Sequence, residues 1–207
     1  MENFFKIRAE KQEHIVNAAF LVFGRQGFRK ASIADIAQAA GITKGMITYY
    51  FGSKKTLYMY LVEVSQKRLV KAMQQRLAAS PVTDIFERLK IAVDVQVAAV
   101  KDHPALISFQ GGLYHETDPA VVSELTEMLT TENMRCDEIL MEGSDLSAFK
   151  PDIDSKLVIK FVQWATEGFF DHLYYLSEDE ENINNLVSEF YKCIDLMKRT
   201  FYREDIC

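Results

Sequence analysis

The spacing of apolar residues predicts helices along almost the whole chain. From Arg8 to Gln26, apolar residues recur at intervals of three and four, which is the pattern of one buried helical face. No segment shows the sustained two-residue alternation of a β-strand bounded by hairpin turns. The fold class that we expect is therefore all-α.

Glycines and hydroxyl residues predict where the first helices end and begin. We expect the first helix to end at Gly27, and Ser32, with Asp35 three residues later, to cap a second helix. Gly41 ends that helix, and Thr43 caps a third, very short helix. The sequence thus predicts two short helices joined by a tight turn.

Longer helices are expected in the remainder of the chain. Ser53 caps a fourth helix, which continues to about residue 79 before Ser80 and Pro81 stop it. Apolar spacing then predicts helices over residues 84–102, 118–141, 153–176 and 180–202. A short element over 104–110 is expected to break at Gly111 and Gly112, and residues 142–152 are expected to form a loop.

The residues between Ser32 and Phe51 suit a helix-turn-helix. Ala37 is small enough for two helices to approach closely, and Gly41 can adopt the left-handed conformation that the turn requires. Ile36 and Ile47 are expected to fix the crossing angle. A third helix held in this way points outward and fits the DNA major groove with its N-terminal residues at base edges.

Charge is distributed unevenly along the chain. The net charge is -6, yet residues 1–60 contain nine Lys or Arg and only four Asp or Glu. A basic N-terminal quarter on an acidic body suggests that the N-terminal part meets a polyanion, although a solvated helical face would carry the same lysines. Charge alone leaves both interpretations open.

Composition narrows the class of protein. Apolar residues make up 48% of the 207 residues and charged residues 26%, as in a folded globular protein. The three cysteines, Cys136, Cys193 and Cys207, are odd in number and far apart, which argues against a disulfide framework and fits a reducing cytoplasm. We expect neither a signal peptide nor a membrane-spanning segment.

The stretch IVNAAFLVFGRQGFRKASIADIAQAAGITKGMITYYFGSKKTL resembles the TetR family of bacterial transcriptional regulators. The matching features are the Gly27 turn, the Ser32 cap, the DIAQAAGI core, TKG, the YYF end and the Ser53–Lys54 start of the fourth helix. The resemblance covers about the first sixty residues. It implies a three-helix DNA-binding unit, linked by the long fourth helix to a larger helical effector-binding and dimerisation domain.

The resemblance also implies roles for individual residues. Four residues would start the recognition helix and face the bases: Thr43, Lys44, Gly45 and Met46. The DNA backbone or base edges would be contacted by Tyr49 and Tyr50, and phosphates by Lys54, with further backbone candidates in Arg29, Lys30, Ser32 and Lys55. The alternative is that these aromatics are core, and we expect at least one of the two tyrosines to pack inward. The sequence departs from the family at Thr48, where Tyr is usual, and at Met46, where a smaller residue is usual.

The resemblance implies a domain division at residues 9–69 and 70–207, with the helix-turn-helix at 32–51. The last two helices carry more apolar surface than one core needs, which favours a homodimer seam. Its expected residues are Phe161, Ala165, Gly168, Phe190, Ile194 and Met197. The alternative is that the same residues form the core of one protomer.

An effector pocket would lie between helices and combine apolar with a few polar side chains. Candidates for its lining are Phe86, Phe109, Gln110, His115, Trp164 and Phe169, most of which would serve equally well as core. His115, Glu116 and Asp118 lie close together in sequence but lack the ligand spacing of a familiar metal site, so we expect no metal or cofactor.

The function expected from the sequence is that of a transcriptional repressor, released from a palindromic operator by an unidentified small-molecule effector. The alternative is an effector-independent DNA-binding or chromosome-organising protein. An enzyme is not expected, because the sequence contains no HExxH, GxSxG, GxGxxG or P-loop motif.

Overall fold

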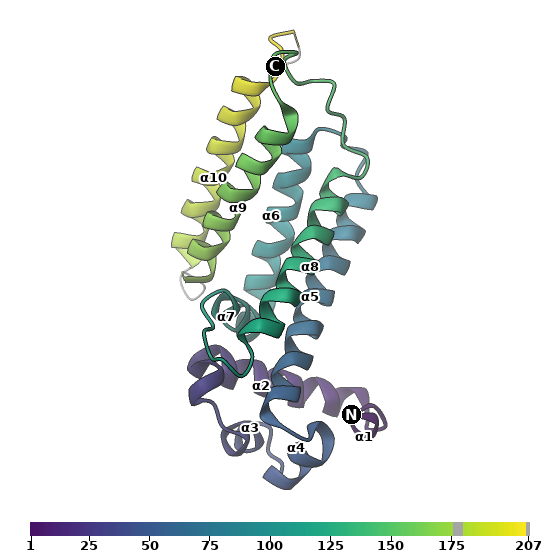
Figure 1. Ribbon diagram of the computed structural model, residues 1–207, viewed down its shortest axis with the longest axis vertical. Helices are drawn as coiled ribbons and strands as arrows, with labels where there is room; N and C mark the ends of the chain where they lie inside the picture. The colour runs from purple at the N-terminus through teal and green to yellow at the C-terminus, as the bar shows by residue number, and fades with distance from the viewer. Residues whose placement is uncertain (176–179, 206–207) are drawn as a thin grey trace. The chain divides into compact units, whose positions relative to one another are not determined.

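The computed structural model describes residues 1–175 and 180–205 (Figure 1). This part of the chain contains ten α-helices and no β-strand, which confirms the all-α prediction. None of its helices is both long and apolar enough to cross a bilayer. The chain forms two compact units: Met1–Arg68 with Asp102–Asn133 is unit 1, and Leu69–Lys101 with Met134–Cys207 is unit 2.

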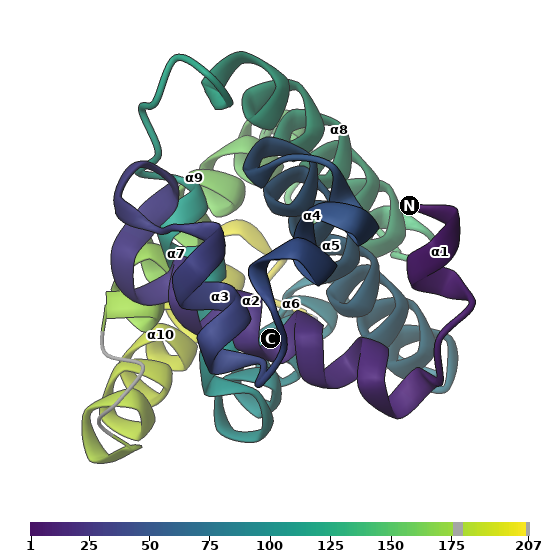
Figure 2. The same ribbon diagram turned by 90° about the horizontal axis from the view of Figure 1, so that it is seen from below.

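Unit 1 begins with four helices, which are α1 (Glu2–Phe5), α2 (Ala9–Lys30), α3 (Ile33–Ala39) and α4 (Lys44–Phe51). It also contains α7 (Pro104–Leu113) and the N-terminal parts of α5 (Lys54–Ala78) and α8 (Val122–Met141). Figure 2 looks onto α3 and α4. The expected boundary at residues 69 and 70 coincides with a change of unit, but residues 102–133 return to unit 1.

Gly27 bends the end of α2. Its φ of 68° and ψ of 173° interrupt the helical conformation, and one further turn follows before Ala31 leaves the helix. Only glycine takes a positive φ at little steric cost, so the predicted role of Gly27 as a terminator of the straight helix is confirmed. The bend turns Phe28 into the core of the unit.

Aromatic rings fill the centre of unit 1. The rings of Phe23, Phe28 and Phe109 surround Tyr58, each with its centroid 5.0–5.3 Å from the tyrosine ring. Gly24 lets α2 approach α7 closely, because a Cβ atom at this position would lie 2.9 Å from the backbone nitrogen of Phe109. The α2–α7 contact therefore fixes residues 102–133 to the N-terminal helices.

Unit 2 is built from α6 (Ile85–Asp102), α9 (Ser155–Tyr175), α10 (Glu180–Phe201) and the C-terminal parts of α5 and α8. Ion pairs join α6 to α10. Lys90 contacts Asp195, and Lys198 contacts both Asp84 and Glu87. Burial lowers the pKa of Lys90 and Lys198, but hydrogen bonds to these carboxylates outweigh it and raise both values overall.

Arg88 is the central polar residue of unit 2. Its guanidinium donates hydrogen bonds to the carbonyls of Ile139, Leu140 and Glu142 at the end of α8, and to that of Val82. The last carbonyls of a helix have no N–H donor within it, so the buried cation supplies donors there, and the Ser144 hydroxyl donates a further hydrogen bond to the Leu140 carbonyl.

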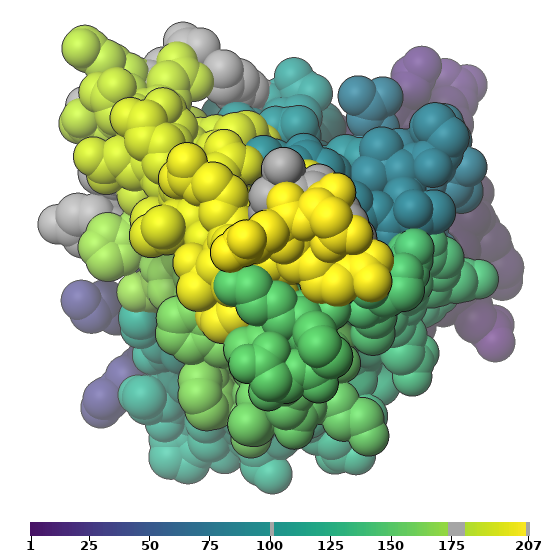
Figure 3. Space-filling view, turned by 90° about the horizontal axis from the view of Figure 1, so that it is seen from above, coloured from purple at the N-terminus to yellow at the C-terminus, as the bar shows by residue number. Residues whose placement is uncertain are grey.

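The loop after α8 closes one end of unit 2. Figure 3 shows this loop, in green, lying against the yellow C-terminal end of α10. Phe149 and Tyr202 form an isolated bridge, and their rings pack with that of Phe86 at centroid distances of 5.0–6.0 Å. The loop predicted over 142–152 is confirmed.

Two predictions about the helices are wrong, and one helix was not predicted. Helix α7 continues through Gly111 and Gly112, because the contacts of α7 with α2 outweigh the low helix propensity of glycine. Helix α8 begins at Val122 rather than Asp118, whose side chain instead caps a preceding turn through the backbone N–H of Ala120. The short helix α1 was not expected. The predicted end of α9 at residue 176 lies outside the described residues.

Candidate nucleic-acid interface

The turn between α3 and α4 has the geometry that the sequence predicted. The Ser32 hydroxyl accepts the backbone N–H of Asp35 at 3.1 Å, and the Thr43 hydroxyl accepts that of Met46 at 3.3 Å. Gly41 has a φ of 59°. The Ser32 cap starts α3, Gly41 reverses the chain after it, and the Thr43 cap starts α4.

Helix α4 has one buried and one exposed face. Ile47, Tyr50 and Phe51 point into the core, as the spacing i, i+3, i+4 dictates. The opposite face carries exposed residues that can meet DNA: Thr43, Lys44, Gly45, Thr48 and Tyr49. Arg29 and Lys30 are also exposed at the end of α2, whereas Ser32 and Met46 are half-buried.

The two tyrosines of α4 differ in exposure. Tyr49 is 66% exposed, but Tyr50 is 5% exposed and its ring centroid lies 5.9 Å from that of Phe4. The prediction that Tyr50 contacts DNA is therefore wrong for its ring, because that ring belongs to the core. The period of α4 contained this information, since residue 50 shares a face with Ile47 and Phe51.

Lys54 also differs from its prediction. Its Nζ donates to the carbonyls of Phe28, Ala31 and Arg29 at 2.8, 3.0 and 3.4 Å, and it lies 4.4 Å from the centroid of the Phe28 ring. A lysine ammonium has three donors, and here all three are used at the end of α2. Lys54 thus caps a helix C-terminus, and the expected phosphate contact by its ammonium is not supported.

Glu116 was not predicted as part of this region. One carboxylate oxygen accepts the backbone N–H of Phe28 at 3.0 Å, and the other accepts those of Thr117 and Asp118. Lys54 and Glu116, which follow Phe28 by 26 and 88 positions, therefore hold the carbonyl and the N–H of this one residue. No local pattern signals a contact between residues 88 positions apart.

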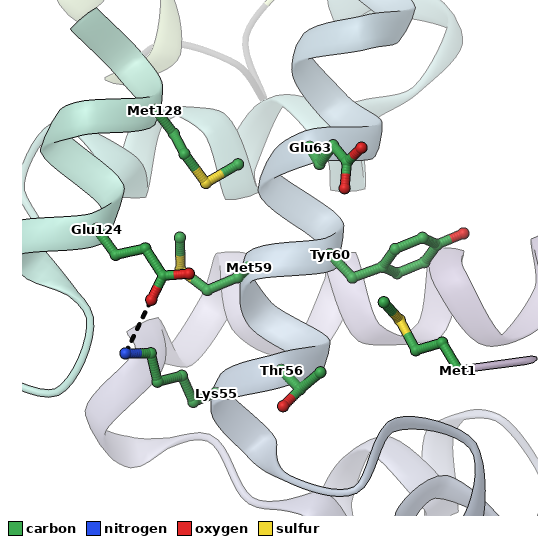
Figure 4. Close-up of a pocket in the computed structure, with 8 residues that line it drawn as sticks. All are labelled: Met1, Lys55, Thr56, Met59, Tyr60, Glu63, Glu124 and Met128. Atoms are coloured by element: carbon green, nitrogen blue, oxygen red, sulfur yellow. Dashed lines mark ion pairs between the residues drawn. The ribbon is translucent and has the colours of Figure 1, made fainter. Parts of the chain in front are cut away.

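Lys55 lies beside an open pocket of about 270 Å³ in unit 1 (Figure 4). Its ammonium pairs with Glu124 of α8 at 2.9 Å, and both side chains are about half exposed. Such a surface ion pair stabilises little, so a phosphate can replace the carboxylate. The pocket is lined mainly by methionines and glutamates and contains none of the residues expected to bind an effector.

The six residues expected to line an effector pocket are divided between the units, with Phe109, Gln110 and His115 in unit 1 and Phe86, Trp164 and Phe169 in unit 2. Phe109 lies in the aromatic core of unit 1, and Phe86 in the ring cluster with Tyr202 of unit 2. His115 is exposed, and Trp164 is 60% exposed with Lys160 Nζ 5.2 Å from its ring centroid. Gln110 is the only one of the six with a buried polar side chain whose oxygen has no hydrogen-bond partner.

The residues expected in the dimer seam also divide into two groups. Three of them are buried within one protomer, namely Phe190, Ile194 and Met197 on α10. Phe190 stacks on Phe169 of α9 with ring centroids 4.2 Å apart, so this face of α10 is core and its assignment to the seam is wrong. Phe169 is thereby also explained as core.

Helix α9 nevertheless has an exposed apolar stripe. Leu157, Phe161 and Trp164 are all more than half exposed and recur at intervals of four and three, so they share one face of the helix. Gly168 extends that face one turn further and is exposed, while Ala165 is half-buried. Apolar side chains concentrated in this way are typical of a protein–protein contact.

Residues 15–61 match the family described as bacterial regulatory proteins, tetR family. The chain is 35% identical over 60 residues to the transcriptional regulator AcrR of Shigella flexneri, covering 29% of this chain and 28% of AcrR. It is 32% identical over 80 residues to BetI of Yersinia pestis (strain Pestoides F), covering 39% and 40%. The aligned part thus spans well under half the length of these relatives.

Solved structures show the same fold over most of the chain. A TetR family regulator from Chloroflexus aurantiacus superposes with a TM-score of 0.72 at 20% identity, covering 99% of both chains. FadR from Bacillus subtilis, solved in complex with stearoyl-CoA, superposes with a TM-score of 0.70 at 18% identity, covering 89% of this chain and 96% of FadR.

Proposed function

The chain belongs to the TetR family of bacterial transcriptional regulators, and we propose that it binds operator DNA through α4. The proposal rests on one observation: α4 is anchored by Ile47 and Phe51 while Lys44, Thr48 and Tyr49 are exposed on its other side. A short helix held in this way fits the major groove. The family consists of regulators and not of enzymes.

Base reading is assigned to the start of α4. Lys44 is exposed and is the only basic residue of the helix, so it is the natural donor to the O6 and N7 acceptors of guanine. The methyl groups of Thr43 and Met46 suit the thymine methyl. Exposed Gly45 has no side chain and lets DNA approach the helix backbone closely.

Phosphate contacts are assigned to donors near the end of α2 and to Lys55 at the start of α5. Arg29 and Lys30 lie exposed at the end of α2. The Ser32 hydroxyl accepts one hydrogen bond from Asp35 and keeps its own proton for donation to a phosphate oxygen. Lys55 joins this set by exchanging Glu124 for a phosphate.

We propose that two copies associate through the exposed stripe of α9. Burying Leu157, Phe161 and Trp164 against a second copy would remove from water an apolar surface that one protomer leaves open. A two-fold dimer presents its reading helices about 34–36 Å apart, and the operator is then a palindrome with matching half-sites. The stripe replaces the α10 residues first expected in this role.

A small-molecule effector is proposed to release the protein from DNA. The buried, unpaired oxygen of Gln110 supports a ligand that donates a hydrogen bond, since buried acceptors normally have a partner. Long-chain acyl-CoA esters are the first compounds to try, because a structural neighbour was solved with stearoyl-CoA. Failure of every effector would favour the alternative, a DNA-binding protein without a small ligand.

Phe28 offers a route for the coupling. Lys54 of α5 and Glu116 of the α7–α8 loop both hold its peptide groups, four residues before the Ser32 cap of α3. A ligand that shifts either segment would therefore move the start of the helix-turn-helix. A coupling free energy of about 1–3 kcal/mol would change operator affinity roughly 5–150-fold.

The cytoplasm is the proposed location, where operator DNA is accessible and thiols stay reduced. Cys193 is exposed and Cys136 is half-buried, and neither forms a disulfide bond. Cys207 lies outside the described residues.

Selection of binding sites from a random duplex pool tests the proposed function. The purified protein is expected to enrich a two-fold symmetric sequence and to bind it as a dimer. A pool that shows no enrichment after repeated rounds would contradict the proposal. Sedimentation with and without Trp164→Glu tests the dimer separately, because a charge in the α9 stripe should give monomers that remain folded.

A further inference from the structure

Residues 1–8, which precede α2, have no role in the proposed DNA contacts and lie outside the residues that resemble the TetR family. This segment contains α1, and α1 packs on the recognition helix α4 as well as on α2. Phe4 is completely buried, whereas its neighbour Phe5 is 56% exposed. The segment therefore inserts one specific aromatic ring into the DNA-reading unit.

The ring of Phe4 touches the inward face of α4. Its centroid lies 4.6 Å from that of Phe51 and 5.9 Å from that of Tyr50. The third neighbour is Tyr60 of α5, at 5.7 Å, and Figure 4 shows the Tyr60 side chain on the same side of α5 as Met1. Phe4 thus fills the space between the recognition helix and the helix that follows it.

A hydrogen-bonded latch keeps the segment in place. The side-chain amide of Gln12 in α2 donates to the carbonyl of Ile7 at 2.8 Å and to that of Phe5 at 3.4 Å. Phe4 is consequently tied to α2 through its own chain and to α4 through its ring. The segment acts as a bracket between two helices of the unit.

Helix α4 depends on such support. It has only eight residues, and a helix of two turns is not stable alone. Its orientation is therefore set by what packs on its buried face, which includes α3, α1 and the Tyr60 ring of α5. Base reading requires this orientation, because hydrogen bonds to base edges are directional, whereas attraction between lysine and phosphate depends mainly on charge.

We propose that Phe4 is a positioning residue for base recognition: it holds α4 at the angle at which its exposed residues meet the bases, without touching DNA itself. The inference rests on the proposed DNA-binding function. Without the Phe4 ring, a void opens beside Phe51 and Tyr50, and α4 tilts or frays into it. Contacts to phosphates survive this change, but contacts to base edges do not.

The test compares Phe4→Ala with Phe5→Ala in the full chain. Affinities are measured for the duplex selected by the wild-type protein and for a shuffled duplex of the same composition. Phe4→Ala is expected to lose about tenfold or more in affinity for the selected duplex while binding the shuffled one as the wild type does. Phe5→Ala removes an aromatic ring from the neighbouring, exposed position and is expected to leave both affinities unchanged.

A second variant distinguishes positioning from folding. Phe4→Leu retains most of the buried volume and is expected to recover most of the discrimination between the two duplexes. It also serves as the test variant if Phe4→Ala does not fold; hydrogen exchange of the α4 amides in Phe4→Leu should then be faster than in the wild type. If Phe4→Ala does not fold, the proposal is overturned when the α4 amides of Phe4→Leu exchange as slowly as in the wild type and the variant discriminates between the duplexes fully.

The outcomes separate this inference from the proposed function. If the wild-type protein selects no sequence, the proposed function itself fails. If it selects a site and folded Phe4→Ala discriminates between the duplexes as well as the wild type, only the role of Phe4 is contradicted. An equal loss of affinity for both duplexes would also contradict it, because that result indicates general destabilisation and not loss of base reading.

Discussion

Each unit uses a cation to complete the end of a helix, but the two cations are placed differently. Arg88 in unit 2 is 6% exposed and reaches four carbonyls with its guanidinium. Lys54 in unit 1 is half-buried and holds three carbonyls of α2 with a single ammonium. A planar fork fixes several acceptors in one geometry, whereas a lysine on a flexible stem can follow or release them.

The difference matches the tasks of the two units. Arg88 is buried and joins the end of α8 to the segment that starts α6. Lys54 lies directly after the recognition helix, at the residue on which Glu116 also acts. We therefore expect changes at Arg88 to affect mainly the free energy of unfolding, and changes at Lys54 to affect DNA binding as well.

Arg88→Ala should have the largest effect. Removing the guanidinium leaves buried carbonyls without donors, and we expect a loss of about 3 kcal/mol or more in the free energy of unfolding. Urea denaturation measures this loss. Arg88→Lys restores the charge but not the fork and should recover only part of the stability. Full recovery by lysine would show that charge alone matters there.

Lys54→Ala should have a smaller effect on stability and a clear effect on DNA binding. We expect the free energy of unfolding to fall by about 1–2 kcal/mol, because the carbonyls at the end of α2 are partly accessible to water. Affinity for the selected duplex should fall as well. Lys54→Arg is the matched control, and unchanged affinity in Lys54→Ala would remove the contrast between the two cations.

The caps and turn around α4 could be predicted from sequence, and the contacts of Lys54 could not. Ser32 and Thr43 each cap the residue three positions later, and Gly41 acts through its own positive φ, so residue type and spacing determine what they do. Lys54 reaches back more than twenty residues to Phe28, and Glu116 reaches 88. Such contacts depend on how helices pack, which one sequence does not encode in any local pattern.

Burial could be predicted only where one face of a helix is clearly apolar. The sequence did not decide which of Tyr49 and Tyr50 packs inward, and the structure exposes Tyr49 and buries Tyr50. The sequence correctly predicted that the apolar residues of α10 share one face, but it did not show whether α9 or a second copy of the chain covers that face. Phe4 had no periodic pattern around it, so its place in the core was unpredictable.

Glu116 adds a second difference between Lys54 and Arg88. It accepts the N–H of the residue whose carbonyl Lys54 holds, whereas Arg88 contacts only carbonyls. Glu116→Ala leaves the Phe28 N–H without its acceptor, and we expect a loss of about 1 kcal/mol in the free energy of unfolding. Exchange of the Phe28 amide should become faster. Glu116→Gln keeps an acceptor oxygen and should retain slow exchange; equal exchange in both variants would argue against the contact.

Asp137→Asn in unit 2 should change the free energy of unfolding least, and it should raise this free energy where the other substitutions lower it. Burial raises the pKa of Asp137, and a hydrogen bond with Gln163 opposes the rise in part. A raised pKa means that ionisation of Asp137 opposes folding. The stabilising contribution of the protonated carboxyl is present below its ordinary pKa and is lost as pH rises through its pKa in the folded protein.

The variant should therefore be more stable than the wild type at neutral pH, by a few tenths of a kcal/mol because the group is partly solvated. The difference should vanish as pH falls below about 3.9, where the carboxyl is protonated in both states. Urea denaturation at pH 7 and at low pH measures it. A wild-type protein that is more stable at pH 7 would contradict the assignment.

The most direct test of the account is the ability of Lys44→Ala to tell the selected duplex from a shuffled one, measured at several salt concentrations. The wild-type protein should bind both with a steep salt dependence and prefer the selected duplex. Lys44→Ala should lose part of that preference at guanine positions, because α4 reads the bases. An unchanged preference in the folded variant would contradict reading by Lys44, and wild-type binding indifferent to both sequence and salt would contradict the role of α4 in DNA recognition.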